Sequence, residues 1–323
     1  MKIKFDWKSI DKPIIALAPM EGYTDSAFRQ IVKKLAPSVI CWTEFASADA
    51  IKVGAKKVIQ KFKFNKKENP LIVQLFGKNL ESFAEAAKII EQSGAAGVDI
   101  NMGCPAKKVI ASQHGSALMK NPELATKIVE TIKKNCKIPV SVKTRLGFNE
   151  ANTASFYQFC TNLINAGASC LTIHGRTTKQ GFSGISDWKP IYELKNKHPE
   201  TTIIGCGDIT SAKEATSMIK NLDGIMVGRA TIGNPWIMSE IVTAFNKTKQ
   251  TPPLTLKQKI PLILEHCKLS IEQKGDERLA MLEMRKILSA YIKGIDNASK
   301  IRTKLVQIYS LAEAKKILNS EII

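Results

Sequence analysis

The sequence places one cysteine where a thiol could take part in a reaction. Cys104 lies in the run Asn101-Met102-Gly103-Cys104-Pro105, directly after an apolar segment that is typical of a buried strand. Pro105 has no amide N–H and a restricted φ, so it restrains the backbone beside the thiol. A thiol that a ligand can reach is able to donate a proton or to attack an electrophile. We therefore predict that Cys104 is a catalytic residue.

The remaining cysteines carry no such signal. The seven cysteines of the chain are scattered, odd in number and form no CxxC pair, which argues against a disulfide framework and against a zinc site. We interpret Cys41, Cys136, Cys160 and Cys170 as small apolar packing residues. No metal is expected.

Polar side chains also follow the other candidate strands. Eight short apolar, β-branched runs are separated by helical stretches, and a polar group follows or ends each run. Polar groups at all eight ends are hard to explain by packing alone. The predicted strands are Ile14–Ala18, Val39–Thr43, Leu71–Leu75, Gly97–Asn101, Val140–Thr144, Cys170–His174, Thr202–Cys206 and Gly224–Val227. The polar residues at their ends are, in order, Glu21, Glu44, Gln74, Asn101, Lys143 with Arg145, His174 with Arg176, Asp208 and Arg229.

The alternation of strands and helices predicts a parallel sheet in an α/β fold. Eight repeats favour a closed (β/α)8 TIM barrel of about 250 residues, in which active-site groups follow the carboxyl ends of the strands. An open doubly wound sheet is the alternative, but Ala18-Pro19-Met20-Glu21-Gly22 is not the glycine-rich turn that usually follows its first strand. Helices are expected at Leu80–Ser93, Ala125–Lys134, Thr153–Ala166 and Ser211–Lys220, with Asn79, Asn121 and Ser211 as N-caps.

The last two strand ends predict an anion site. Barrels frequently bind phosphate in the loops after strands seven and eight. Gly205, Gly207, Gly228 and Gly233 would let backbone amides approach an anion, and Arg229 could neutralise it with a forked donor.

Two further donors end adjacent strands. Lys143 ends the fifth predicted strand and His174 the sixth. Both could donate hydrogen bonds or charge to an electron-rich ring. We therefore expect both beside a bound ligand.

The charge balance favours a polyanionic partner, although a lysine-rich surface of no function is the alternative. Lys and Arg number 48 against 29 Asp and Glu, a formal net charge of +19. Charge is densest after Phe245, where residues 246–323 hold 15 Lys and Arg against 8 Asp and Glu. A polar linker over Asn246–Pro253 leads there into purely helical periodicity over Leu254–Ile323. We therefore expect a barrel domain over 1–245 and a small helical domain over 246–323.

Six sequence blocks together resemble the tRNA-dihydrouridine synthases. The run Asn101-Met102-Gly103-Cys104-Pro105 most resembles the bacterial B-type branch of that family. The resemblance covers nearly the whole chain. The blocks are Ala18-Pro19-Met20-Glu21-Gly22-Tyr23-Thr24-Asp25, Asp99-Ile100-Asn101-Met102-Gly103-Cys104-Pro105-Ala106-Lys107-Lys108, Ser141-Val142-Lys143-Thr144-Arg145-Leu146-Gly147, Leu171-Thr172-Ile173-His174-Gly175-Arg176-Thr177, Gly207-Asp208-Ile209 and Met226-Val227-Gly228-Arg229-Ala230.

The resemblance implies an FMN-dependent enzyme that uses NADPH (or NADH) to reduce the C5=C6 bond of specific uridines in tRNA. It implies that Cys104 donates the proton and that the helical domain binds tRNA. Implied cofactor contacts are Pro19, Met20, Glu21, Gln74, Lys143, His174, Cys206, Gly207, Asp208, Gly228 and Arg229. Implied substrate contacts are Asn101, Lys143, His174 and Arg176.

One position departs from the family pattern. Relatives commonly carry Asn-Gly-Asp after strand seven, whereas this chain has Cys206-Gly207-Asp208. A thiol cannot replace an amide that both donates and accepts, so the contact of Cys206 with a flavin is in doubt.

Two other functions stay open at this point. An FMN barrel acting on a free pyrimidine, as dihydroorotate dehydrogenases do, would share the barrel features, and so would a tRNA-binding protein that has lost catalysis. The basic helical tail argues against the first, and the retained polar strand ends argue against the second. With no apolar run long enough for a membrane span and no secretory signal, we expect a cytoplasmic protein. The sequence leaves the oligomeric state open, with a monomer favoured.

Overall fold

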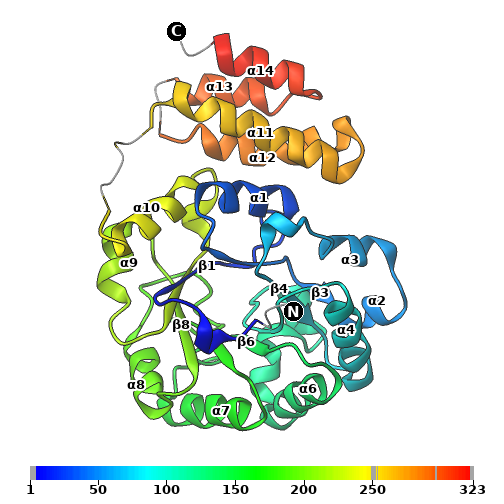
Figure 1. The fold of residues 1–323 in the computed structure, drawn as a ribbon, viewed down its shortest axis with the longest axis vertical. Helices are drawn as coiled ribbons and strands as arrows, with labels where there is room; N and C mark the ends of the chain where they lie inside the picture. The colour runs from blue at the N-terminus through cyan, green and yellow to red at the C-terminus, as the bar shows by residue number, and fades with distance from the viewer. Residues whose placement is uncertain (1–4, 249–251, 253, 295–296, 321–323) are drawn as a thin grey trace.

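Eight parallel strands close into a barrel with helices around it (Figure 1), which confirms the predicted fold. The computed structural model describes residues 5–248, 252, 254–294 and 297–320. Strand β1 pairs with both β2 and β9, and β2 pairs with β4, which closes the ring. The strands are β1 (Ile14–Leu17), β2 (Ile40–Trp42), β3 (Ala46–Ser47), β4 (Leu71–Phe76), β5 (Gly97–Met102), β6 (Val140–Arg145), β7 (Cys170–His174), β8 (Thr202–Cys206) and β9 (Gly224–Val227).

The second barrel strand is broken, which the sequence prediction did not anticipate. Its first part, β2, pairs with the start of β4, and β3 pairs with the end of β4. In the gap between them, the hydroxyl of Thr43 accepts a hydrogen bond from the amide of Gln74 at 3.1 Å. A side chain therefore replaces one backbone partner where the ladder is interrupted.

Along each strand, side chains point alternately to the apolar core under the helices and to the interior of the barrel. In β5, Val98, Ile100 and Met102 belong to the main apolar core between the strands and the surrounding helices. Asp99 and Asn101 alternate with them and so point to the barrel interior. The same alternation puts every second residue of the neighbouring strands inside the barrel, where polar side chains at the carboxyl end can meet.

The helices between strands agree with the predicted pattern. All four predicted helices are present, and Asn79, Asn121 and Ser211 accept N-cap hydrogen bonds from Ser82, Leu124 and Glu214. The helices of the barrel are α1 (Ser26–Leu35), α2 (Ala48–Lys52), α3 (Lys56–Lys61), α4 (Leu80–Gln92), α5 (Lys107–Ala111), α6 (Pro122–Asn135), α7 (Thr153–Asn165), α8 (Lys189–Lys197), α9 (Ala212–Met218) and α10 (Trp236–Phe245). Short 3-10 helices are η1 (Trp7–Ser9), η2 (Lys66–Glu68), η3 (Gly115–Lys120) and η4 (Arg229–Thr231).

The amino end of the barrel is filled by aromatic residues. Trp7, from the segment before β1, stacks on Trp42 with ring centroids 5.7 Å apart. Both belong to an apolar cluster inside the barrel with residues such as Ile14, Ile72 and Met226. This cluster closes one end, so a ligand can enter only from the carboxyl end of the strands.

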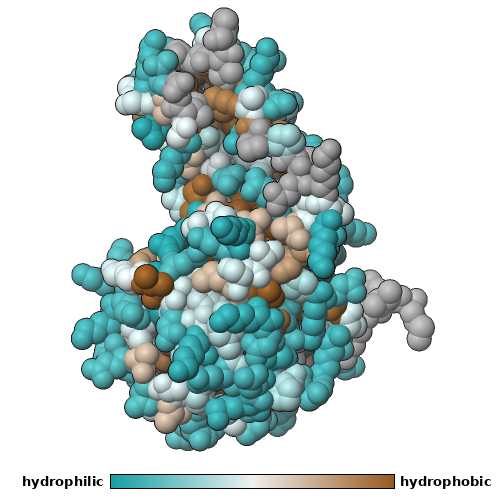
Figure 2. Space-filling view, turned by 90° about the vertical axis from the view of Figure 1, so that its left-hand side faces the viewer, coloured by the Kyte–Doolittle hydropathy of each residue, from teal (hydrophilic) through white to brown (hydrophobic). Residues whose placement is uncertain are grey.

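The tail is helical, as predicted, and its described residues form four helices that lie against α1 and α10 (Figure 1). They are α11 (Leu256–Lys274), α12 (Glu277–Tyr291), α13 (Ala298–Leu305) and α14 (Leu311–Ser320). In the face shown in Figure 2, mostly hydrophilic residues cover a large and a small lobe, and apolar residues appear in small separate groups. The predicted linker over Asn246–Pro253 lies partly outside the described residues.

The barrel and the tail share one apolar cluster. The tail core includes Trp236 from α10, and Tyr23 and Leu35 from the barrel pack against it. The carboxylate of Glu265 binds Lys34 at 2.6 Å, and the side chain of Gln273 accepts from the amide of Ala27 at 3.0 Å. The tail is therefore docked on the barrel through polar as well as apolar contacts.

Gly233→Ala should disrupt this docking. Gly233 has φ +72°, and an added Cβ would lie 2.3 Å from the carbonyl carbon of Ala290 in α12. We expect a loss of roughly 1–3 kcal/mol from overpacking beyond the cost of the left-handed backbone, measured by chemical denaturation.

The matched control is Gly275→Ala. Gly275 has φ +68° and no heavy atom within 4 Å of the added Cβ, so only the backbone cost of roughly 1 kcal/mol applies. Equal losses for the two variants would show that Gly233 is not needed for close packing of the tail.

Candidate active site

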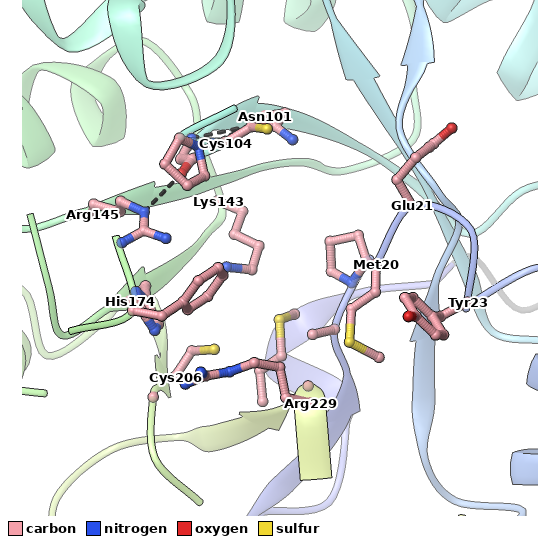
Figure 3. A pocket seen from close by; sticks show the side chains of 18 of the residues that line it. Met20, Glu21, Tyr23, Asn101, Cys104, Lys143, Arg145, His174, Cys206 and Arg229 are labelled. Carbon is pink, nitrogen blue, oxygen red and sulfur yellow. Dashed lines mark hydrogen bonds between the residues drawn. The ribbon is translucent and has the colours of Figure 1, made fainter. Parts of the chain in front are cut away.

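A pocket of about 1010 Å³ opens at the carboxyl end of the strands (Figure 3). This volume is at the upper end of the range for ligand pockets, about 300–1,000 Å³, so it has room for a ligand of several rings. All the contacts implied for the cofactor, the substrate and the proton except Arg176 line it: Pro19, Met20, Glu21, Gln74, Asn101, Cys104, Lys143, His174, Cys206, Gly207, Asp208, Gly228 and Arg229. Two glycines predicted for the anion site, Gly205 and Gly233, do not line it, because they pack against Trp188 and Ala290 instead.

Arg176 has a different position from the one expected for a substrate contact. Its side chain is buried behind the pocket wall, where Nη2 binds the carboxylate of Asp208 at 2.7 Å and Nε donates to the carbonyl of Ser183 at 3.0 Å. These contacts make Arg176 a support for Asp208 and for the loop after β7.

The ends of β8 and β9 offer free backbone donors. Among the described residues, the amides of Gly207, Asp208 and Gly228 donate to no acceptor, and all three residues line the pocket. Gly207 has φ +128° and Asp208 φ +54°, a backbone turn that favours glycine at the first position. Arg229 lies beside them with its side chain half exposed. Together these groups can bind an anion.

The carboxylate of Asp208 would not repel an anion bound at this site. It accepts from the amide of Ser186 at 2.8 Å, pairs with Arg176 and lies 3.5 Å from Arg229. Burial alone would raise the pKa of the Asp208 carboxyl, but the hydrogen bonds from Ser186 and Arg176 outweigh burial and hold that pKa below its usual value. The ionised carboxylate is thus matched by two guanidinium groups.

Three side chains hold the backbone around Cys104 by four hydrogen bonds. The side-chain oxygen of Asn101 accepts from the amides of Gly103 and Cys104 at 3.1 and 2.9 Å. The hydroxyl of Ser116 donates to the carbonyl of Cys104 at 2.9 Å, and Arg145 Nε donates to the carbonyl of Gly103 at 2.7 Å. We call residues 103–105 the cysteine loop. Its thiol is therefore placed by a fixed backbone.

The Cys104 thiol is protonated at neutral pH. Burial raises the pKa of the thiol above its ordinary value, and the nearby charges of Arg145 and Lys143 only partly oppose this. The thiol is half-buried, whereas the other six cysteines are buried. Cys104 can therefore act as an acid. The other cysteines predicted to be packing residues are buried, as expected: Cys41, Cys136, Cys160 and Cys170.

Lys143 and His174 differ in charge. Lys143 extends into the middle of the pocket (Figure 3) and makes no hydrogen bond to any described residue. Burial, and then the charges of Lys143, Arg145, Arg176 and Arg229, lower the pKa of His174 to about 2. His174 is thus neutral and can only donate or accept hydrogen bonds, and its buried Nδ1 has no partner within the described chain.

Sequence reasoning named Arg145 at the end of the fifth predicted strand but gave no role in the site to Arg145 or to Phe182, which both line the pocket. Arg145 joins the cysteine loop to the loop after β7, since Nη1 donates to the carbonyls of Thr177 and Gly181 at 3.1 and 2.8 Å. Phe182, on that loop, is 54% exposed and its ring lies 4.3 Å from the Arg229 guanidinium. The position of Arg145 at a strand end was a usable signal, whereas an aromatic residue in a loop gave none.

The tail reaches the pocket mouth. Tyr23 lines the pocket, and the ammonium group of Lys286 in α12 lies 4.6 Å from the centroid of its ring. A ligand larger than the pocket would therefore meet α12 as it leaves the barrel.

Two kinds of feature are absent from the described residues. No cluster of three or more His, Cys, Asp or Glu side chains there could hold a metal ion. None of the helices described is long and apolar enough to cross a membrane.

Comparisons with known proteins agree on one family. Residues 16–323 match the model described as Dihydrouridine synthase (Dus). A probable tRNA-dihydrouridine synthase 1 of Synechocystis is 35% identical over 94% of this chain and 85% of its own length. Similar proteins of Rickettsia bellii and Staphylococcus aureus are 34% and 31% identical over 89% and 99% of this chain, covering 88% and 96% of their own lengths.

A solved structure shares the fold alone. A variant of NCR from Zymomonas mobilis aligns with a TM-score of 0.50 and 15% identity. The alignment covers 74% of this chain and 88% of that chain. This likeness agrees with the barrel and carries no statement about chemistry.

The raised pKa of Cys104 predicts slow alkylation near neutral pH. Because the thiolate is the nucleophile, the rate with iodoacetamide should stay low up to about pH 8.5, the ordinary thiol pKa, and rise only above it. Peptide mass spectrometry of the native protein measures this, with the unfolded chain as control. A rate at pH 7 equal to that of the unfolded chain would contradict the prediction.

Proposed function

The chain belongs to the dihydrouridine synthase family, and we propose that it reduces the C5=C6 bond of specific uridines in tRNA. One observation carries the proposal: a single pocket is lined by unpaired backbone amides with Arg229 on one wall and by a protonated thiol on the other. That pairing suits a phosphate-bearing redox cofactor beside a substrate that needs a proton. The cytoplasm, where tRNA is used, is the proposed place of action.

The residues present fit FMN. The free amides of Gly207, Asp208 and Gly228 with Arg229 suit its phosphate, and an added Cβ at Gly207 would lie only 2.8 Å from Ser186. Pro19 and Met20 offer apolar surface for the ring at the centre of the pocket. A bound flavin would take electrons from NADPH or NADH and supply hydride to the uracil.

The charged and neutral donors have separate proposed roles. Hydride addition at C6 leaves negative charge at C5 and on the neighbouring carbonyl oxygen. Lys143 would stabilise this charge, because its ammonium is free in the pocket. Neutral His174 and the amide of Asn101 would hold the uracil carbonyls by hydrogen bonds.

Cys104 would complete the reaction as the acid. The proton passes from its sulfur to C5, and the thiolate that remains lies near Arg145 and Lys143, whose charges favour it. The fixed cysteine loop keeps the thiol on one face of the ring. The target base must leave the RNA stack to reach this position.

The tail is the proposed RNA-binding part, with the boundary near residue 245. In α12, Arg278 and Arg285 lie 5.0 and 4.5 Å from the ring centroid of Tyr309, which is 47% exposed. Aromatic rings between guanidinium groups suit contact with RNA bases and phosphates. We call Arg278, Arg285 and Tyr309 the Tyr309 patch. With Lys286 at the pocket mouth, it would extend the RNA contact along α12.

Cys104→Ala tests the reaction itself. The variant should stay folded and yellow and should still be reduced by NADPH, while reoxidation by tRNA slows by about 10² to 10⁴, the usual contribution of a placed acid. Stopped-flow flavin absorbance separates the two half-reactions. Cys160→Ala is the control because that thiol is fully buried outside the pocket. Wild-type reoxidation in Cys104→Ala would assign the proton to another group.

Arg229→Ala tests the cofactor site. Loss of a charge-assisted hydrogen bond should weaken flavin retention by roughly 1.5–3 kcal/mol. Flavin content after extensive dialysis measures it. The control is Lys189→Ala, which removes an exposed charge outside the pocket. Full flavin occupancy in Arg229→Ala would exclude Arg229 as a phosphate contact.

Arg278→Ala tests the Tyr309 patch. Removing one phosphate contact should weaken tRNA binding at low salt and lower the slope of log affinity against log salt by about 1. The control is Lys268→Ala, which removes the same charge from the exposed surface of α11. If both variants lose affinity equally, only net charge matters and the patch is not a specific contact.

A further inference from the structure

We propose that Asp99 is a positioning residue for the cysteine loop: its carboxylate sets the orientation of two amide side chains, which in turn hold the backbone of Cys104. As a statement about catalysis this rests on the proposed function, and as a statement about the loop it does not. Asp99 lies below the pocket, inside the barrel, and does not line it.

The register of three strands brings the participants together. Gln74 of β4 lies beside Asp99 of β5, and Asp99 lies beside Ser141 of β6. Gln74 Nε2 donates to Asp99 Oδ2 at 2.7 Å, and Ser141 Oγ donates to Asp99 Oδ1 at 2.6 Å. Asn101 Nδ2 then donates to Gln74 Oε1 at 3.0 Å. A continuous chain of hydrogen bonds therefore runs from Asp99 through Gln74 to Asn101, the side chain that binds the cysteine loop. We call this chain of hydrogen bonds the relay.

The relay has a direction that only an acceptor at position 99 can set. An ionised carboxylate only accepts, so Gln74 must turn its NH2 group toward Asp99 and its oxygen toward Asn101. Asn101 must then present its NH2 group to Gln74, which leaves its oxygen for the amides of Gly103 and Cys104. If either amide turned over, two donors would face each other in a buried site, at a cost of roughly 1–3 kcal/mol.

Burial makes this arrangement strict. Asp99 and Gln74 are fully buried, so water cannot replace a lost partner. Burial raises the pKa of Asp99 to about 6, while the neighbouring donors Ser141, Gln74 and Trp42 and the charge of Lys143 oppose it, so the carboxylate is mostly ionised at neutral pH. The side-chain amide of Asn101 keeps one N–H outside the relay, and because Asn101 lines the pocket, this orientation also decides which donor a ligand meets.

A double-mutant cycle on the full chain as purified tests the proposal. The rate of iodoacetamide labelling at Cys104 is measured by peptide mass spectrometry in Asp99→Ala, in Asn101→Ala and in the double variant. We expect labelling to rise roughly three- to tenfold in each single variant, because local opening exposes the thiol. The double variant should show no further rise, because both changes break the same relay.

Two controls distinguish loss of this relay from a general loosening of the pocket. Cys206 lines the same pocket but belongs to β8, so its labelling should not change. Ser141→Ala removes the other hydrogen bond to Asp99 and leaves the relay to Asn101, so it should change Cys104 labelling less than about twofold. If Asp99→Ala does not fold, Gln74→Leu removes the centre of the relay and takes its place.

The outcomes are distinct from those of the proposed function. Unchanged Cys104 labelling in Asp99→Ala, an additive double variant, or equal rises at Cys104 and Cys206 would each overturn the relay, whether or not the protein reduces tRNA. If the relay holds, Asp99→Ala should also slow reoxidation by tRNA about 10- to 100-fold, because the placement of the acid has changed. Reoxidation by tRNA at the wild-type rate in Asp99→Ala would show that the relay does not place the acid.

Discussion

The parallel register of a closed barrel is the constraint on which the rest of the structure depends. It places Gln74, Asp99 and Ser141 side by side in one interior layer, and Asn101 beside Lys143 in the next layer toward the carboxyl end. A shift of one residue would turn these polar side chains toward the helices and their apolar partners into the barrel. Because the ring closes through β1, β2 and β9, no strand can slip alone. The fixed register thus places Asn101 and Lys143 side by side at the carboxyl end of the strands, directly below the cysteine loop.

The pocket concentrates positive charge in a partly buried space. Lys143, Arg145 and Arg229 line it, and their charges help to keep His174 neutral. Burial also lowers the pKa of Arg145 to about 10, still well above neutrality. Charges of one sign at such a site are costly unless an anion matches them. A phosphate and the negative charge formed during uracil reduction would supply that match under the proposed function, so the same charges would bind the cofactor and stabilise the product of hydride transfer.

The tail and the barrel act as one structural unit. Trp236 of α10 lies in the apolar core of the tail, and Gly233 brings the backbone beside Ala290 of α12. This docking holds α12 against the loop after β1, where Tyr23 and Lys286 meet at the pocket mouth. RNA bound along α12 would therefore be held at a fixed distance from Cys104, which suits an enzyme that must select one base in a large folded substrate.

Much of this protein was determined by the sequence itself. Strand and helix positions, the barrel, the helical tail and the pocket position of Cys104, Lys143 and Asp208 follow from local periodicity and from the rule that parallel strands end together. Those inferences depend on spacing within single elements and on repeat number. They require no knowledge of which side chains touch.

The tertiary structure alone decided the contacts between elements. The family resemblance implied Arg176 as a substrate contact, whereas its side chain turns behind the pocket wall and binds Asp208. Asp99 looked like an ordinary strand residue, yet the register makes it the base of a relay to Asn101. The direction in which a long side chain turns depends on partners from strands and loops far along the chain. Those partners meet only when the barrel closes, so no local pattern could reveal them.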